Sequence, residues 1–381
     1  MRRRLHIGWL LAISCWLLAV SCSSSDETEE KQPTMLTVYV YSPDRPMLIR
    51  SAFDEVNPSV EESKITRLQI WIFENTDDEN NGKKVAYFDT EETSLLSAGE
   101  GATYKIRVSD DFAQRKPSVD VYVIANLPKG EYGNTLNKES TREEVLAATI
   151  PEGYFGLSTL TTTVPAEGLP MAGKLEEQPV IGVAPVLRVG TTTNIATVQL
   201  TRCVSKVRFA FANTTGSSNL YITGITLDTE MIPNAEYLIP RTSIETNDDY
   251  NSTSVTLFSG SENPVASVPN PTIYIYDGQE AQEYEDLING AGLTMVGPFY
   301  LRESDQKLSG TISYKIGESY EEVEEDEATN GVFTMNQEGD FSRNHTWIIY
   351  AYHLGGGFLE MNTLYIKDWT NRTTDYEVYN W

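Results

Sequence analysis

Histidine and cysteine, the side chains that most often bind metals or act as nucleophiles, are scarce in this chain, which has three of each among 381 residues. His345 and His353 are eight residues apart, and this even spacing would place both on one face of a strand. Such a pair could begin a metal site, but no Cys, Asp or Glu cluster accompanies it at ligand spacing. We therefore favour the interpretation that the two histidines are polar residues at the ends of a strand. Cys203 lies in an apolar stretch and is predicted to be a small core residue.

Two acidic stretches offer carboxylates that could bind a cation. Residues 75–82, NTDDENNG, resemble the start of a calcium-binding loop that begins at Asp77. The twelfth position of that loop is Phe88, so the closing carboxylate is missing, and the stretch instead predicts a hairpin turn. Residues 321–327, EEVEEDE, are interpreted as a solvated loop rather than a cation site.

Motifs of enzymes are also missing from the sequence. It contains neither a Gly-x-Ser-x-Gly turn nor a glycine-rich phosphate loop. We therefore predict that the chain is not an enzyme, with no catalytic residue, no metal and no cofactor.

The leader contains the most specific local motif. It begins with MRRR and continues with an apolar run over residues 5–20, which is short for a membrane span. Small residues then precede Cys22, and the pattern resembles a bacterial lipobox, although the usual leucine is displaced by one position. This predicts a lipoprotein signal peptide over residues 1–21 and a lipid, such as palmitate, on Cys22. The alternative is an ordinary secretory signal with an incidental cysteine.

Acidic residues dominate the rest of the chain. The formal net charge is −26, which makes a nucleic-acid partner improbable because such a surface repels phosphates. Residues 23–33, SSSDETEEKQP, are polar and predict a disordered tether. They also resemble the acidic tag of surface-exposed lipoproteins in some Gram-negative anaerobes. The alternative is a plain solvated spacer.

The body of the chain has the pattern of a β protein. Short stretches rich in Thr, Val, Ile and Tyr alternate with turn-forming residues, and helical patterns occur only at 141–150 and, more weakly, at 278–290. This predicts an all-β fold of two tandem transthyretin-like, Greek-key β-sandwich domains with few short helices, over residues 51–200 and 201–381. The predicted strands lie within residues 36–41, 64–74, 119–128, 193–200, 205–213, 220–227, 272–276, 310–316, 345–353 and 362–369.

The connection that follows the first predicted strand has an unusual sequence. Residues 36–41 alternate as a strand, but Pro43 and Pro46 interrupt the pattern, and Arg50 follows. Proline donates no backbone hydrogen bond, so these prolines keep the connection out of the sheet. An exposed, extended connection of this kind is where proteases act.

Six stretches, spread in order over nearly the whole chain, resemble the fimbrillins, the subunits of type V pili. The most specific is residues 341–369, which resembles the closing hairpin of minor or tip-type members. The others are the lipobox leader, residues 49–53 followed by 61–76, residues 119–128, residues 168–174 and residues 200–213.

The resemblance implies a mechanism of assembly. A surface protease with Arg-specific or trypsin-like preference would cut between Arg50 and Ser51, since Arg45 precedes a proline that blocks cleavage. Residues 22–50 would then be a propeptide that leaves with the lipid. Its strand would be a placeholder, and its removal is expected to strip one edge of the N-terminal sandwich. The placeholder anchors would be Leu36, Val38 and Val40.

A neighbouring subunit would then supply the strand that replaces the placeholder. The candidate donor is the C-terminal tail, with Tyr376, Val378 and Trp381 as apolar anchors. The tail could instead be the last strand of its own domain.

Two functions follow as hypotheses. The first is a structural or adhesive subunit of a surface fimbria, located at the outer membrane and then in the extracellular fimbrium. Its partners would be other subunits, the protease and a host or bacterial surface ligand. The alternative is a surface glycan-binding lipoprotein of a nutrient-uptake system, which aromatic platforms on one face would favour.

Overall fold

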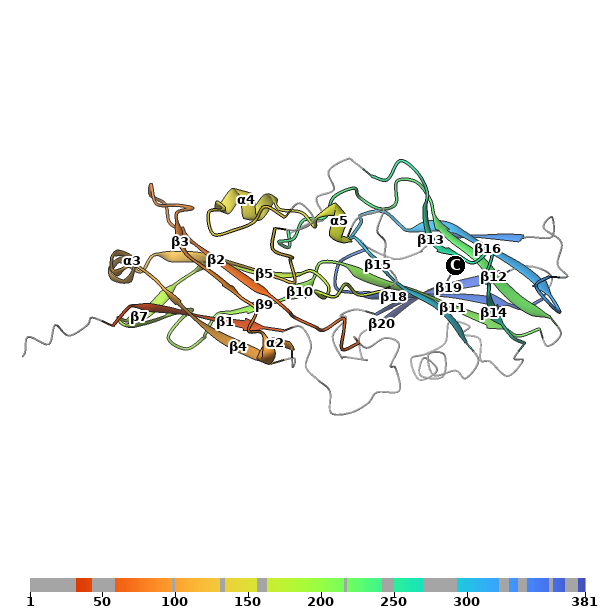
Figure 1. The fold of residues 1–381 in the computed structure, drawn as a ribbon, viewed down its shortest axis with the longest axis horizontal. Helices are drawn as coiled ribbons and strands as arrows, with labels where there is room; N and C mark the ends of the chain where they lie inside the picture. The colour runs from red at the N-terminus through yellow and green to blue at the C-terminus, as the bar shows by residue number, and fades with distance from the viewer. Residues whose placement is uncertain are drawn as a thin grey trace, which may run out of the picture.

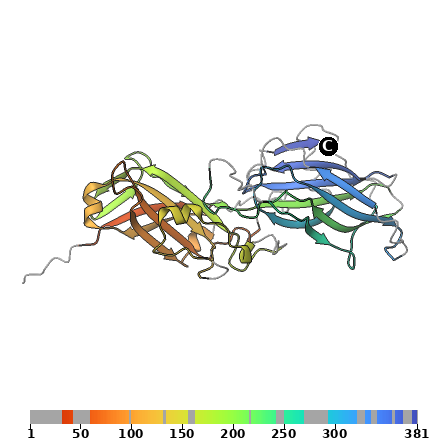
Figure 2. The same ribbon diagram turned by 90° about the horizontal axis from the view of Figure 1, so that it is seen from above.

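The computed structural model shows two β-sandwiches placed end to end (Figures 1 and 2). In residues 360–366 and 376–380 it describes the backbone alone. The described residues are 32–42, 59–97, 100–130, 134–155, 163–215, 218–241, 250–269, 293–321, 329–334, 341–355, 359–366 and 376–380.

The N-terminal sandwich consists of two five-stranded sheets. The first has the order β4-β1-β8-β7, with β9 also paired to β1, and the second has the order β10-β6-β5-β2-β3. The strands of the first sheet are β1 (Met35–Tyr41), β4 (Gly101–Arg107), β7 (Val180–Val183), β8 (Val186–Val189) and β9 (Thr197–Gln199). Those of the second are β2 (Leu68–Asn75), β3 (Lys84–Thr90), β5 (Ser118–Ala125), β6 (Met171–Gln178) and β10 (Thr201–Arg202).

The C-terminal sandwich repeats this plan. One sheet has the order β15-β11-β18-β19-β20, and the other has the order β13-β12-β16-β17, with β14 also paired to β12. The first sheet contains β11 (Ser205–Asn213), β15 (Thr294–Leu301), β18 (Thr346–His353), β19 (Leu359–Ile366) and β20 (Tyr376–Asn380). The second contains β12 (Asn219–Leu227), β13 (Val255–Ser259), β14 (Val265–Ser267), β16 (Ser309–Gly317) and β17 (Thr329–Thr334). The predicted all-β sandwich fold is therefore confirmed.

Helices in the described residues are short: α2 (Ser94–Ser97), α3 (Asp110–Arg115), α4 (Arg142–Ala147) and α5 (Glu152–Phe155). The predicted helix start at 141–150 is confirmed, because Thr141 and Glu144 form a capping box at the start of α4. The helix ends earlier than predicted, at Ala147. The predicted strand at 272–276 and helix at 278–290 lie outside the described residues.

Alternation along the strands builds a core inside each sandwich, and a third core joins the two. The third core covers the outer face of the β5–β2 region with side chains from both sandwiches. Trp71 and Tyr122 come from the N-terminal sandwich, whereas Val204, Leu238 and Tyr300 come from the C-terminal part. Because apolar side chains are continuous across the junction, we expect the two sandwiches to move as one body.

Candidate functional site

The first strand, β1, lies in the interior of its sheet. It pairs antiparallel with β4 along its whole length, from Met35 opposite Arg107 to Tyr41 opposite Gly101. Its other side pairs in parallel, first with β8 and then with β9. The expectation that β1 forms an edge is therefore wrong. β8 and β9 pair with the second side of β1, and they come from about 150 residues further along the chain. The sequence around β1 therefore could not indicate them.

One face of β1 packs into the N-terminal core. Leu36, Val38 and Val40 are at most 1% exposed, whereas the residues between them are only half-buried. Each fully buried aliphatic side chain stabilises the fold by about 1.5–3 kcal/mol. On the outer face, the Tyr39 ring covers Gly101, where an added Cβ would lie 2.0 Å from the Tyr39 hydroxyl. The inner anchors thus hold the strand, and its outer face has little cover.

We call the space that β1 occupies the β1 slot. Its walls are the backbone N–H and C=O groups of β4 on one side and of β8 and β9 on the other. Adjacent strands lie about 4.8 Å apart, so a sheet that lacks β1 would have a gap of roughly two strand spacings. Unpaired backbone groups of this kind are a template for another strand.

The connection that follows β1 lies largely outside the described residues, and so do Cys22, Arg50 and Ser51. The chain is described again from Ser59, in a tight turn at the junction of the two sandwiches. In this turn the Ser59 amide donates to Glu62 Oε2 at 2.7 Å, and the Glu62 amide donates to Ser59 Oγ at 3.1 Å. The reciprocal bonds fix the direction of the Glu62 side chain.

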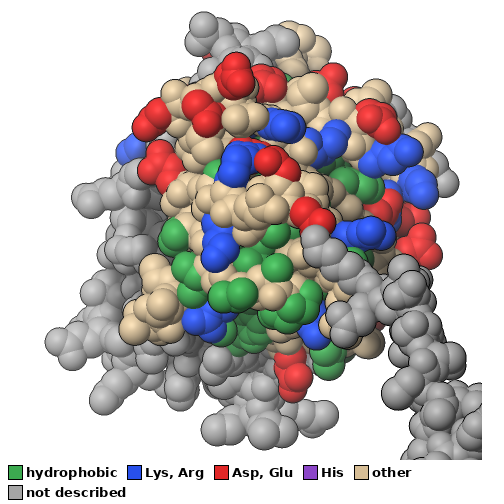
Figure 3. Space-filling model, turned by 90° about the vertical axis from the view of Figure 1, so that its left-hand side faces the viewer, with side chains coloured by type: hydrophobic (Ala, Val, Ile, Leu, Met, Phe, Trp, Pro, Cys, Tyr) green, Lys and Arg blue, Asp and Glu red, His purple; other side chains and the backbone are tan. Residues whose placement is uncertain are grey.

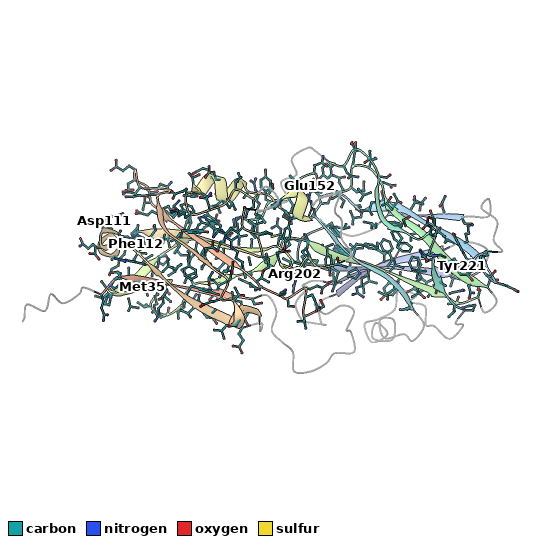
Figure 4. All side chains as sticks on the ribbon, in the orientation of Figure 1. Met35, Asp111, Phe112, Glu152, Arg202 and Tyr221 are labelled. Carbon is teal, nitrogen blue, oxygen red and sulfur yellow. The ribbon has the colours of Figure 1, made fainter. Side chains whose placement is uncertain are left out.

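Glu62 points into the C-terminal part of the molecule. Its carboxylate accepts hydrogen bonds from Lys206 Nζ at 2.9 and 3.1 Å and from the Tyr300 hydroxyl at 2.6 Å. Its backbone carbonyl accepts from Arg202 Nε at 3.1 Å. Figure 4 shows Arg202 between the two sandwiches. We call Glu62, Lys206, Tyr300 and Arg202 the Glu62 cluster, and all four side chains are buried.

Electrostatics in the Glu62 cluster favour the charged carboxylate. Burial alone would raise the pKa of Glu62, but the Lys206 ammonium and the hydrogen bonds from Tyr300 and Lys206 hold it below its ordinary value. Burial raises the pKa of Tyr300, and the Glu62 carboxylate raises it further, so this hydroxyl keeps its proton. The turn after the β1 connection is therefore fixed to the second domain by a buried ion pair.

The C-terminal tail forms an edge strand. β20 pairs antiparallel with β19, from Tyr376 opposite Ile366 to Asn380 opposite Asn362, and β19 is its only neighbour in the described sheet. This pairing agrees with the alternative given in the sequence analysis, in which the tail is the last strand of its own domain. Trp381 lies outside the described residues, and side-chain positions are described for neither Tyr376 nor Val378.

The two histidines lie at opposite ends of β18 and do not meet. His345 precedes the strand, and its Nδ1 contacts the Arg343 carbonyl at 2.6 Å. His353 ends the strand with Nδ1 3.3 Å from Asn213 Oδ1, and burial lowers its pKa. Among the described residues, no group of three or more His, Cys, Asp or Glu side chains could hold a metal ion.

The other sequence-predicted positions also have defined places. Cys203 is fully buried in the third core, as predicted, and burial raises the pKa of its thiol to about 12. Residues 76–83 form the turn of the β2–β3 hairpin, where Asp78 Oδ1 accepts from the Asn80 amide at 2.8 Å. Most of residues 321–327 lie outside the described residues.

Sequence reasoning missed the Glu62 cluster. The spacing of Ser59 and Glu62 has the Ser-x-x-Glu form of a capping box and could have indicated an ordered turn. Its partners are 140 or more residues away, so pattern alone could not find them.

Within the described ranges, no helix combines the length and the apolar character needed to cross a membrane.

Comparison with known proteins gave structural likeness only. No protein-family model and no curated protein matches the chain. A solved structure of the tip fimbrial protein Mfa3 from Porphyromonas gingivalis, with C-terminal truncation, is 13% identical with a TM-score of 0.47, and the alignment covers 92% of this chain and 100% of that chain. A fimbrial assembly protein from Parabacteroides distasonis gives the same four values. Likeness at this level concerns the fold alone.

Proposed function

We propose that this chain is a structural or adhesive subunit of a surface fimbria that assembles by strand exchange after cleavage at Arg50. The observation that carries the proposal is the interior position of β1. A first strand that fills the middle of a sheet, with one face in the core, leaves a two-sided slot when it is removed.

Cleavage at Arg50 would convert β1 from a covalent part of the chain to a bound fragment. Its hold would then depend on the ladders to β4, β8 and β9 and on the burial of Leu36, Val38 and Val40. A strand from another subunit could restore both, because strand addition supplies backbone hydrogen bonds and places alternate side chains in pockets. The Glu62 cluster keeps the turn at residues 59–62 in place.

The donor in this proposal is the C-terminal tail of a neighbouring subunit. β20 has one strand neighbour among the described residues, whereas β1 has three. Detaching β20 thus breaks a single ladder, and placing the tail in the β1 slot forms ladders on both sides. Pairing is therefore gained relative to a cut subunit whose slot β1 has already left.

Export and location in the proposal rest on the sequence motifs. The leader supports lipidation at Cys22 and an outer-membrane, surface-exposed lipoprotein before processing. The further partners are an Arg-specific or trypsin-like surface protease and other fimbrial subunits.

Glycan binding receives less support from the surface. The large hydrophobic side chains that are exposed in the described residues are all Val, Leu or Ile, so no aromatic platform is found among them. A cavity of about 530 Å³ beside α4 is lined mainly by polar side chains such as Asn134, Asn137 and Glu139. Among the described residues, none of the side chains that line it is aromatic.

The test is to treat the full chain with an Arg-specific protease and to measure binding of a peptide that copies residues 34–42. We expect the cut protein, and not the intact protein, to bind this peptide and a peptide of residues 370–381. Arg50→Ala should abolish cleavage and binding. The matched control Arg45→Ala lies in the same connection and should be cut as usual. Binding of both peptides to uncut Arg50→Ala protein, or to neither form, would contradict the proposal.

A further inference from the structure

The segment that follows β12, residues 228–241, ties the two sandwiches together at their junction, and we call it the junction strap. Two backbone hydrogen bonds join it to the N-terminal part of the molecule. The Leu238 amide donates to the Ala148 carbonyl at 2.9 Å, and the Ile150 amide donates to the Glu236 carbonyl at 2.8 Å. The strap therefore adds a non-covalent tie to the direct chain connection between the sandwiches.

Glu236 carries a carboxyl group from the junction strap into the interior of the protein. Elsewhere, as at the far end of the N-terminal sandwich, Lys, Arg, Asp and Glu side chains lie on the surface, where water solvates them (Figure 3). Glu236 is only 2% exposed. Arg343 Nη2 donates to Glu236 Oε1 and, at 2.6 Å, to Glu303 Oε1. The Glu303 amide donates to Glu236 Oε2 at 2.8 Å. We call Glu236, Glu303 and Arg343 the Glu236 cluster, in which two carboxyl groups share one guanidinium.

Charges in the Glu236 cluster do not balance if both carboxyl groups are ionised. The other charged or titratable side chains around the cluster are Cys203, Arg302, Glu152, Tyr237 and Arg241. Arg302 donates to Glu152 Oε2 at 2.7 Å and to the Pro233 carbonyl at 3.1 Å, so its charge is directed elsewhere. Burial raises the pKa of Cys203 to about 12, so this thiol is neutral. Because a buried, uncompensated charge is costly, two carboxyl groups that share such a site keep a proton between them.

The environments of the two carboxyl groups assign this proton to Glu236. Burial raises the pKa of Glu236 well above its ordinary value, Arg343 opposes this effect, and the charge and hydrogen bond of Glu303 add to it. Burial would also raise the pKa of Glu303, but the Arg343 guanidinium and hydrogen bonds from Arg343 and Glu236 hold it below its ordinary value. Glu236 is therefore the protonated partner, and Glu303 is the ionised partner that pairs with Arg343.

We propose that the Glu236 cluster is a proton-dependent lock on the junction, in which the proton shared by Glu236 and Glu303 holds the strap in place and its release loosens the strap. Arg343 also donates to the Leu238 carbonyl at 2.9 Å and to the Tyr237 carbonyl at 2.7 Å, so the cluster holds the same strap residues that form the tie. Since the folded-state pKa of Glu236 is raised, the stability from its proton is fully present below pH 4.5 and is lost as the pH rises through the folded-state pKa. The Glu62 cluster has the opposite dependence, because the pKa of Glu62 is lowered.

Hydrogen exchange of the Ile150 and Leu238 amides tests the lock, because these amides form the two bonds of the tie. The full, uncut chain is used, so the result does not depend on strand exchange. After correction for intrinsic exchange, the protection factors of both amides should fall between about pH 5 and pH 8, by up to about tenfold per pH unit. In Glu236→Gln, which is uncharged at every pH, they should change by less than about twofold over this range. The matched control Glu230→Gln, at an exposed position of the same strap, should keep the wild-type dependence.

Two further measurements identify the shared proton. A carboxyl group in water is ionised at about pH 6, so the infrared spectrum of the wild type at this pH should contain a band of a protonated carboxyl group that Glu236→Gln lacks. Glu303→Gln leaves Glu236 alone with Arg343 and should reduce the fall in protection. Constant protection factors in the wild type would overturn the lock, whatever the variants do. An equal fall in Glu236→Gln, or absence of the infrared band, would overturn the assignment of the proton to Glu236.

Discussion

The strands β1 and β11 occupy the same place in their sandwiches, and they differ in how they are held. Each has an antiparallel neighbour on one side, β4 or β15, and a parallel neighbour on the other, β8 with β9, or β18. In β1 only the three inward side chains are buried. In β11 every residue except Arg208 is buried, so both faces of the strand are covered.

The ends of the two strands differ as well. At the start of β11, Lys206 forms a buried ion pair with Glu62, and at its end the Asn213 side chain donates to the Ser218 and Ser267 carbonyls. At the corresponding end of β1, Ser42 is the last described residue before the connection that carries Arg50. Removing β11 would uncover two faces and break an ion pair, whereas removing β1 uncovers one face. The position of a strand in its sheet therefore does not by itself make the strand removable.

The largest effect is expected for a charge placed on the outer face of each strand. Ala212 is fully buried on the face of β11 that points away from the core, so Ala212→Asp should destabilise the C-terminal sandwich by more than about 4 kcal/mol. Thr37 has the same orientation in β1, is half-buried and lies between Lys105 and Arg188, so Thr37→Asp should change stability by at most about 0.5 kcal/mol. Urea unfolding checks both values. Equal losses would break the comparison, and Ala212→Asn separates the effect of charge from that of size.

The next-largest effect is expected at the start of β11, where Lys206 forms an ion pair with Glu62. Glu62→Gln leaves the Lys206 ammonium buried without a carboxylate and should cost about 3 kcal/mol of stability. Glu61→Gln, at an exposed neighbouring position, is the matched control and should cost less than about 0.5 kcal/mol. Thermal unfolding measures both. The double variant Glu62→Leu, Lys206→Met should recover most of the loss, because a well-packed apolar pair can replace a buried ion pair. No recovery would show that hydrogen bonds from Tyr300 and Ser59 dominate the site.

Local patterns in the sequence predicted several strands but did not predict the order of the strands in the sheets. Alternation identified β1, β2, β5, β11, β12, β16 and β18, because these strands carry strong apolar periodicity. β3 (KVAYFDT) carries its apolar residues in one consecutive run, and β17 (TNGVFT) carries only two, so neither strand shows alternation and neither was predicted. The inward anchors of β1 followed from period two, but its interior position did not, since strand order depends on contacts between residues distant in sequence. The Glu62 cluster was missed for the same reason.

A smaller effect is expected for the anchors that hold β1 after cleavage. In protein cut at Arg50, Val38→Ala removes buried methyl groups and should weaken the hold on β1 by about 2 kcal/mol. The dissociation constant of the 34–42 peptide should rise about 30-fold when the peptide carries the same change. A peptide with Thr37→Ala should bind within about threefold of the original, because Thr37 lies outside the core. Equal weakening by the two changes would show that backbone pairing, and not the pockets, holds the strand.

The smallest effect is a pH dependence at the Glu62 cluster. The folded-state pKa of Glu62 is lower than its ordinary value of 4.5, so the folded protein binds this proton less readily than the unfolded chain does. The stability from this group is therefore fully present above pH 4.5 and is lost as the pH falls through the lower, folded-state pKa. The difference in unfolding free energy between wild type and Glu62→Gln should shrink as the pH falls from about 6 to about 3. Denaturant unfolding at several pH values measures this difference, and other carboxylates cancel because both proteins contain them. A constant difference over this range would mean that Lys206 does not stabilise the charged form of Glu62. The start of β11 would then be held by packing in the third core, and the contrast with β1 would narrow to the burial of their outer faces.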